Sequence, residues 1–198
     1  AKIASKWITK DKKKLPLYFP MVDNQNTLKS AWRVAGNELM KMVQKEERVV
    51  FLAQGDISLF STGSYLSKEF EKYHSECIVK LIPGVTSFSA AAAKSKFTLA
   101  LQEEQLLVVP VPKKAEELKI ILNEAVLRKR VVVLLKLGEK WTWVKPLLEE
   151  LDLIKSSIFA ERIGFSNQQI LKASDLSAET RPYFSLLLIR QCWPLILP

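Results

Sequence analysis

The 198-residue sequence has few of the residues that commonly build special sites: six glycines, two cysteines and one histidine. Cys77 and Cys192 lack the spacing of a metal site and are too few for a disulfide framework, so we expect free thiols in a reducing compartment. No apolar run reaches the about 20 residues needed to cross a bilayer, and the first residues do not read as a signal peptide. We therefore expect a cytoplasmic protein without a metal centre.

Missing motifs exclude several classes of ligand. The sequence contains neither a G-x-G-x-x-G fingerprint nor a P-loop, so a dinucleotide or nucleoside triphosphate site is not supported. It also lacks an Arg/Gly run and a basic stretch interleaved with aromatic residues, which are typical of RNA-binding segments. The formal net charge is nevertheless +9. This excess favours an anionic partner, such as nucleic acid, a membrane surface or a carboxylate-rich small molecule, without choosing among them.

Apolar runs alternate with helical patterns along most of the chain, which predicts an α/β fold with largely parallel sheets. The runs predicted as strands are residues 48–53, 77–82, 105–111, 131–135, 157–162, 169–172 and 183–190. The predicted helices cover residues 27–47, 62–73, 86–93, 112–128 and 141–151. The last three strands follow one another without helices, so we expect antiparallel pairing there. The polar residues 102–105 predict a boundary between two α/β domains, residues 1–103 and 104–198.

Two loops follow predicted strands at the edge where open α/β sheets bind ligands. Residues 54–61 follow the first predicted strand, and residues 83–87 follow the second. Glycine in such a loop lets a ligand approach the backbone, and Asp56 can accept a hydrogen bond from a hydroxyl or an amine. Serine and threonine hydroxyls and helix N-terminal amides suit a carboxylate. On spacing alone, two structural turns with helix caps explain these loops better than a ligand site does.

The order of residues in these loops resembles that of the tetrapyrrole methylases. Residues 55–66, GDISLFSTGSYL, are similar to the Gly-Asp loop of that family, and residues 82–93, IPGVTSFSAAAA, are similar to its second loop. Residues 17–21 and 183–190 also fit, and residues 61–66 are closest to the branch that methylates C20 of precorrin-2. Ile57 is a departure, because the family usually has proline after Gly-Asp. The family's opening strand and Gly/Pro-rich loop are expected ahead of Ala1.

The resemblance implies two α/β domains of the tetrapyrrole methylase type, with S-adenosylmethionine bound as methyl donor in a cleft between them, and a homodimer. The expected reaction is methylation of C20 of precorrin-2, or of its cobalt complex, in cobalamin biosynthesis. The residues implied in cofactor binding are Gly55, Asp56, Leu59, Ser61, Thr62, Thr86, Ser87, Leu135, Ile163 and Tyr183. Those expected beside the tetrapyrrole are Tyr18, Pro20 and Met21, and basic residues are expected to hold its carboxylates.

No residue identifies itself as a catalytic base. His74, the only histidine, is expected on the surface at the end of a helix. Two other functions stay open. The same fold is compatible with methylation of another tetrapyrrole carbon, of a modified protein residue or of RNA, and binding to RNA would weaken steeply with salt. Alternatively, the chain is a non-enzymatic binding module, an interpretation that Ile57 favours.

Overall fold

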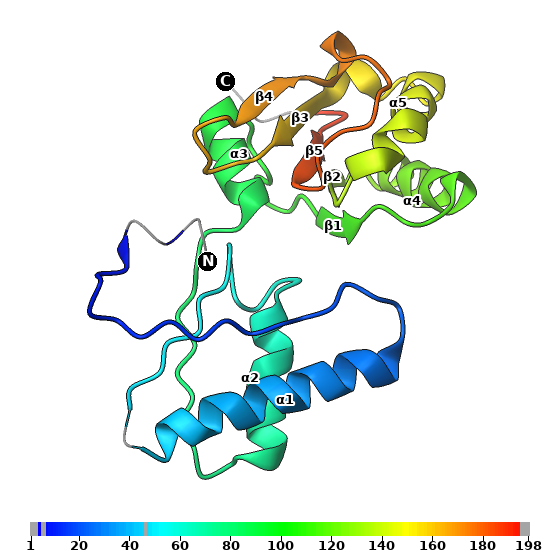
Figure 1. Cartoon of the computed structure of the whole chain (residues 1–198). Helices are drawn as coiled ribbons and strands as arrows, with labels where there is room; N and C mark the ends of the chain where they lie inside the picture. Colours follow the sequence, from blue (N-terminus) through cyan, green and yellow to red (C-terminus); the bar gives the residue numbers. More distant parts are fainter. Residues whose placement is uncertain (1–3, 5–6, 46, 195–198) are drawn as a thin grey trace. The chain divides into compact units, whose positions relative to one another are not determined.

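The computed structural model describes residues 4, 7–45 and 47–194, and the chain divides into two compact units, Ala1–Thr86 and Ser87–Pro198 (Figure 1). The predicted boundary near residue 103 therefore falls inside the second unit. The cause is helix α3 (Ser87–Ser95), whose buried Phe88, Ala91 and Ala92 pack on the sheet of that unit. Helices and a five-stranded sheet confirm the predicted α/β class.

The second unit is built on one mixed sheet with the strand order β1-β2-β5-β3-β4. Its strands are β1 (Leu106–Pro110), β2 (Val131–Leu135), β3 (Ser157–Glu161), β4 (Gln169–Lys172) and β5 (Ser185–Ile189). The first two pair in parallel, and the β2–β5, β5–β3 and β3–β4 pairs are antiparallel. The antiparallel pairing predicted for the last three strands is confirmed.

Helices cover both faces of this sheet, which explains why its central strands are apolar throughout. Helices α4 (Ala115–Leu127) and α5 (Trp141–Glu150) lie on one face, and α3 lies on the other (Figure 1). Because side chains alternate along a strand, Leu134 and Leu187 enter the core under α4 and α5. Val133 and Leu188 enter the core under α3.

The first unit is built around two packed helices, α1 (Gln25–Val43) and α2 (Thr62–Tyr73) (Figure 1). Leu39 and Met40 of α1 form a small core with Leu66 and Phe70 of α2. None of the helices seen within residues 4, 7–45 and 47–194 is both long enough and apolar enough to cross a bilayer.

The strands predicted at residues 48–53 and 77–82 are not formed. Both segments run without a ladder partner among the described residues of the first unit, and the side chains of Val50 and Ile78 are 76% and 97% exposed. A strand is stabilised by cross-strand pairs, so apolar residues alone do not make one where no neighbouring strand is available.

Candidate functional site

Asp56 joins the two predicted ligand loops of the first unit. Its Oδ2 accepts a hydrogen bond from the backbone N–H of Gly84 at 2.8 Å, and its Oδ1 accepts from the backbone N–H of Ser58 at 2.8 Å and from the Ser58 hydroxyl. The Ser58 hydroxyl, followed by the two backbone donors, lowers the pKa of Asp56. The carboxylate thus positions the loops and stays ionised at neutral pH.

Two glycines let these loops touch backbone to backbone. A Cβ atom on Gly84 would lie 2.2 Å from the carbonyl oxygen of Gly55, which is far inside the contact distance of those atoms. Gly55 itself has φ +76°, a conformation that favours glycine, and a Cβ there would find only the Val85 oxygen nearby, at 3.8 Å. The space where a Gly55 side chain would lie is therefore open, and whether a ligand uses it stays a prediction.

Ile57, the departure from the family pattern, anchors the first loop on helix α2. Its carbonyl oxygen accepts a hydrogen bond from the Ser64 hydroxyl at 2.6 Å. Its side chain occupies the space beside Gly63, where an added Cβ would lie 2.6 Å from Ile57 Cγ1. Next to it, the buried Ser61 caps α2 by accepting from the Gly63 N–H at 3.1 Å. The Ser61 hydroxyl thus has a structural task in addition to any ligand contact.

We expect Gly63→Ala to lower the free energy of unfolding by about 1–3 kcal/mol, because its methyl group overpacks against Ile57. Ile57→Ala frees that space, so the double variant is expected to be more stable than the sum of the two single effects predicts. Urea denaturation of the four proteins measures the coupling. Strictly additive effects would show that Ile57 and Gly63 do not share this contact.

The remaining predicted residues of these loops lie at helix starts or on the surface. Leu59 is 36% exposed, and Thr62 is the first residue of α2. Thr86 is half-buried at the end of the first unit, whereas Ser87 opens helix α3 in the second.

The strand register of the second unit brings its three predicted cofactor residues to one edge of the sheet. Leu135 ends β2 opposite Leu186 of β5, and Glu161 at the end of β3 lies opposite Ser185. Tyr183 lies two residues before β5, and Ile163 lies two residues after β3. Gly138 has φ +50°, a conformation that favours glycine, and lies next to Tyr183, whose Cα would be 3.7 Å from an added Cβ.

Charged groups at the same edge were missed by the sequence analysis. Lys136 directly follows β2, and Lys140 lies one helical turn further on. Glu161 is only 4% exposed, and its Oε2 has no hydrogen-bond partner among the described residues. The sequence signal for them was a charged residue directly after β2, Lys136, and one at the end of β3, Glu161.

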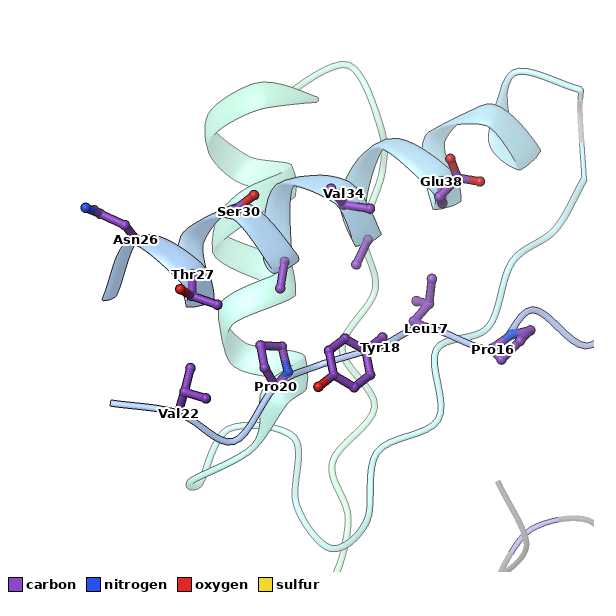
Figure 2. A pocket seen from close by; sticks show the side chains of 12 residues that line it. Pro16, Leu17, Tyr18, Pro20, Val22, Asn26, Thr27, Ser30, Val34 and Glu38 are labelled. Atoms are coloured by element: carbon purple, nitrogen blue, oxygen red, sulfur yellow. The ribbon is translucent and has the colours of Figure 1, made fainter. Parts of the chain in front are cut away.

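A groove of about 900 Å³ lies between the extended residues 16–22 and helix α1 (Figure 2). Of the three residues expected beside the substrate, Tyr18 and Pro20 line the groove, whereas Met21 is not among its lining residues and is 81% exposed. Most of the lining is apolar. Its one charged side chain, Glu38, pairs with Lys41 at 2.6 Å. The groove therefore suits an apolar surface better than a carboxylate.

His74 is a packing residue rather than the surface residue we expected. It ends helix α2, and its ring lies 5.2 Å from that of Phe70. Its buried Nε2 has no hydrogen-bond partner in the part of the chain that the structure describes. Its side chain thus packs beside the small core of the first unit.

Comparison with known proteins relates these loops and this sheet to one family. The sequence profile of the Tetrapyrrole (Corrin/Porphyrin) Methylases matches residues 1–176. Cobalt-precorrin-2 C(20)-methyltransferase of Salmonella typhimurium is 27% identical over 178 residues, which are 89% of this chain and 72% of that protein.

Two solved structures have a similar fold. The methyltransferase CobJ matches with a TM-score of 0.62 and 21% identity over 80% of this chain and 70% of its own. Uroporphyrin-III C-methyl transferase from Thermus thermophilus, complexed with S-adenyl homocysteine, matches with a TM-score of 0.54 and 19% identity over 82% of this chain and 72% of its own. At these identities the likeness concerns the fold.

Proposed function

Because this chain belongs to the tetrapyrrole (corrin/porphyrin) methylase family, we propose that it transfers a methyl group from S-adenosylmethionine to C20 of precorrin-2, or of its cobalt complex, in cobalamin biosynthesis. The family match confirms the resemblance inferred from the sequence. The observation that carries the proposal is the 178-residue match to the Salmonella typhimurium C20-methyltransferase. It includes both loops that Asp56 joins.

The loops of the first unit fit the methyl donor. When bound, S-adenosylmethionine supplies a methyl group on a positively charged sulfur, which an electron-rich ring carbon can attack in line. The open backbone at Gly55 allows a ligand to approach closely, and Asp56 keeps that backbone in place. Around them, the proposed contacts are Leu59, Ser61, Thr62, Thr86 and Ser87. We expect these residues to orient the methyl donor and exclude water. Aligning the methyl group with the attacking carbon raises the rate of methyl transfer.

The second unit offers a different surface to the cofactor. Leu135 and Ile163 are half-buried at the sheet edge, and Tyr183 is 48% exposed beside them. We assign these three side chains to apolar contacts with the cofactor. The charged Glu161 lies on the other face of the sheet from Leu135, because Phe159 and Leu134 share the core under α4 and α5.

The groove of the first unit is the proposed contact for the tetrapyrrole ring. Its volume of about 900 Å³ is within the range typical of small-molecule sites. Tyr18 and Pro20 offer apolar surface to the ring, and the exposed Met21, which follows Pro20 in the chain, is the third proposed contact. We further propose a cytoplasmic homodimer, as is usual in the family, and multi-angle light scattering of the purified protein measures its mass.

Methyl transfer to a defined carbon tests the function. The folded full chain is incubated with ¹³C-methyl S-adenosylmethionine and either precorrin-2 or its cobalt complex. We expect one added methyl group by mass spectrometry and a ¹³C signal assigned to C20. A methyl group on another ring carbon would agree with a tetrapyrrole methylase but would contradict C20 as the methylated position. If the folded protein transfers no methyl group to either substrate, the proposal is wrong. Methyl transfer to RNA would then favour the alternative that the chain methylates RNA.

A further inference from the structure

Three lysines gather at the carboxyl ends of β1 and β2. The backbone N–H of Val111, which follows β1, donates to the carbonyl oxygen of Leu135 at 2.8 Å and thereby joins the two strand ends. Lys136 comes directly after Leu135, and Lys113 comes two residues after Val111. The ammonium of Lys140 reaches back to this junction and donates to the Val111 carbonyl oxygen at 2.5 Å.

The position of Lys140 is unfavourable for a cation in several ways. Burial lowers the pKa of Lys140, and the charges of Lys113 and Lys136 lower it further. Lys140 is also the N-cap residue of α5, where the helix dipole is positive. Within the described residues no carboxylate forms an ion pair with it, whereas Lys119 and Lys145 on the neighbouring helices pair with glutamates.

The neighbouring helix adds to the positive field. Helix α4 begins at the carboxyl end of β1, next to Lys113, and its N-cap residue Lys114 makes no side-chain capping hydrogen bond. Glu116 and Glu117 in its first turn offset part of the dipole. A local conflict of this kind, in which like charges and a helix dipole meet, is typical of a binding site that an anion completes.

We propose that Lys113, Lys136 and Lys140 form a carboxylate-binding site that holds acidic side chains of the substrate. This inference rests on the proposed function for its ligand, a ring that carries many carboxylates. Charge-assisted hydrogen bonds to carboxylates are the strong ones, and the Lys140 ammonium, which donates to the Val111 carbonyl oxygen, has further N–H donors for a ligand. The apolar groove of the first unit supplies none, because its one charged residue is Glu38.

Charge-neutral variants test the site. Lys136→Gln and Lys140→Gln are each expected to raise the KM for the substrate about tenfold, with little change in kcat. The Tm of the Lys140→Gln variant is expected to equal or exceed that of the wild type, because removing a cation relieves the repulsion. A lysine with a merely structural role would instead give a lower Tm and an unchanged KM.

Lys155→Gln is the matched control. Lys155 is exposed and precedes β3, which runs parallel to β2, so it lies at the opposite edge of the same sheet. The variant has the same charge change, and its KM is expected to stay that of the wild type. An equal rise in KM for Lys155→Gln would show that the effect comes from the net charge of the protein, which would contradict a carboxylate site at these lysines.

One further measurement distinguishes a carboxylate of the substrate from that of the cofactor. A second tests the lysine site independently of the proposed methyl transfer. The affinity for S-adenosylhomocysteine, measured by calorimetry, is expected not to change in the lysine variants. A loss of that affinity with an unchanged substrate KM would assign the lysines to the cofactor's carboxylate instead. If the wild type transfers no methyl group, binding of uroporphyrin, a polycarboxylic porphyrin, still tests the site by absorbance titration. Equal uroporphyrin affinity of wild type and Lys136→Gln/Lys140→Gln would refute it.

Discussion

Replacing Gly84 with alanine is expected to abolish binding of S-adenosylhomocysteine and to lower the free energy of unfolding by about 3 kcal/mol. The added Cβ would lie 2.2 Å from the Gly55 oxygen and 3.0 Å from its carbonyl carbon. Both are backbone atoms, so no side-chain rotation relieves the clash, and the two loops must separate. Separation breaks the hydrogen bond from the Gly84 N–H to Asp56 and misplaces the proposed cofactor loop. Calorimetry and thermal unfolding measure the two effects.

Gly36→Ala is the control for this substitution. Gly36 lies inside helix α1, and an added Cβ there would lie 3.1 Å from Cγ of Glu69, a flexible side chain. Alanine also favours a helix interior by about 1 kcal/mol over glycine. The control is therefore expected to bind S-adenosylhomocysteine as the wild type does. Wild-type binding by Gly84→Ala would mean that contact between the two loops is not needed for the cofactor.

Local patterns predicted the second unit well because its elements are stabilised within short stretches of sequence. The predicted strand at residues 131–135 is β2, and the predicted helix at residues 141–151 ends one residue later than α5. Four consecutive valines and leucines, residues 131–134, are all buried, as a strand covered on both faces requires. A strand that is buried on both faces can be predicted from its sequence because all of its residues are apolar.

Features that depend on distant partners were not predicted. Residues 48–53 have the composition of a buried strand, but a strand also needs a neighbour, and composition does not supply one. The contact of Lys140 with the Val111 carbonyl oxygen depends on the register of β1 on β2. The polar residues 102–105 suggested a domain boundary, yet Glu104 among them is bound by Arg190, 86 residues later in the chain. Local sequence patterns cannot predict these contacts, because each one joins residues that are far apart in the chain.

The loops illustrate the same distinction within the candidate site. The resemblance implied Asp56 in cofactor binding, and the structure shows that its carboxylate accepts a hydrogen bond from the Gly84 N–H of the second loop. Their mutual hydrogen bond was not predicted, because it joins residues 28 positions apart. Ile57 shows the opposite case. The sequence marked it as a weak point of the loop, whereas its packing against Gly63 and its bond to Ser64 hold the loop on α2.

The pair of Arg190 and Glu104 locks the start of the second unit onto its last strand. The guanidinium donates from Nη1 to Oε1 at 2.6 Å and from Nη2 to Oε2 at 2.8 Å, and its Nε and Nη2 donate to the carbonyl oxygen of Thr98 at 3.1 and 2.9 Å. The side chains of Arg190 and Glu104 are only 2% and 12% exposed. Arg190 thus binds the chain between α3 and β1 at two points, Thr98 and Glu104.

Arg190→Met is therefore expected to lower the free energy of unfolding by about 3–5 kcal/mol, because it leaves Glu104 buried without its partner. The double variant Arg190→Met/Glu104→Met is expected to recover part of that loss, since it removes the unpaired charge. Urea denaturation at pH 7 measures both. A surface pair gives the control: Glu150→Gln, opposite Lys119, is expected to cost less than about 1 kcal/mol.

The same pair predicts an acid-dependent loss of stability with a defined sign. The Arg190 hydrogen bonds lower the pKa of Glu104 below its ordinary value of 4.5, despite burial that raises it. The folded state thus binds the Glu104 proton more weakly than the unfolded state does, so the stabilisation is complete above pH 4.5 and is lost as the pH falls through the lowered pKa. The Tm difference between wild type and Glu104→Gln is expected to be largest at pH 7 and to shrink towards pH 3. A difference that stays constant over that range would show that the charge on Glu104 does not stabilise the fold, and that its shape alone holds the connection to β5.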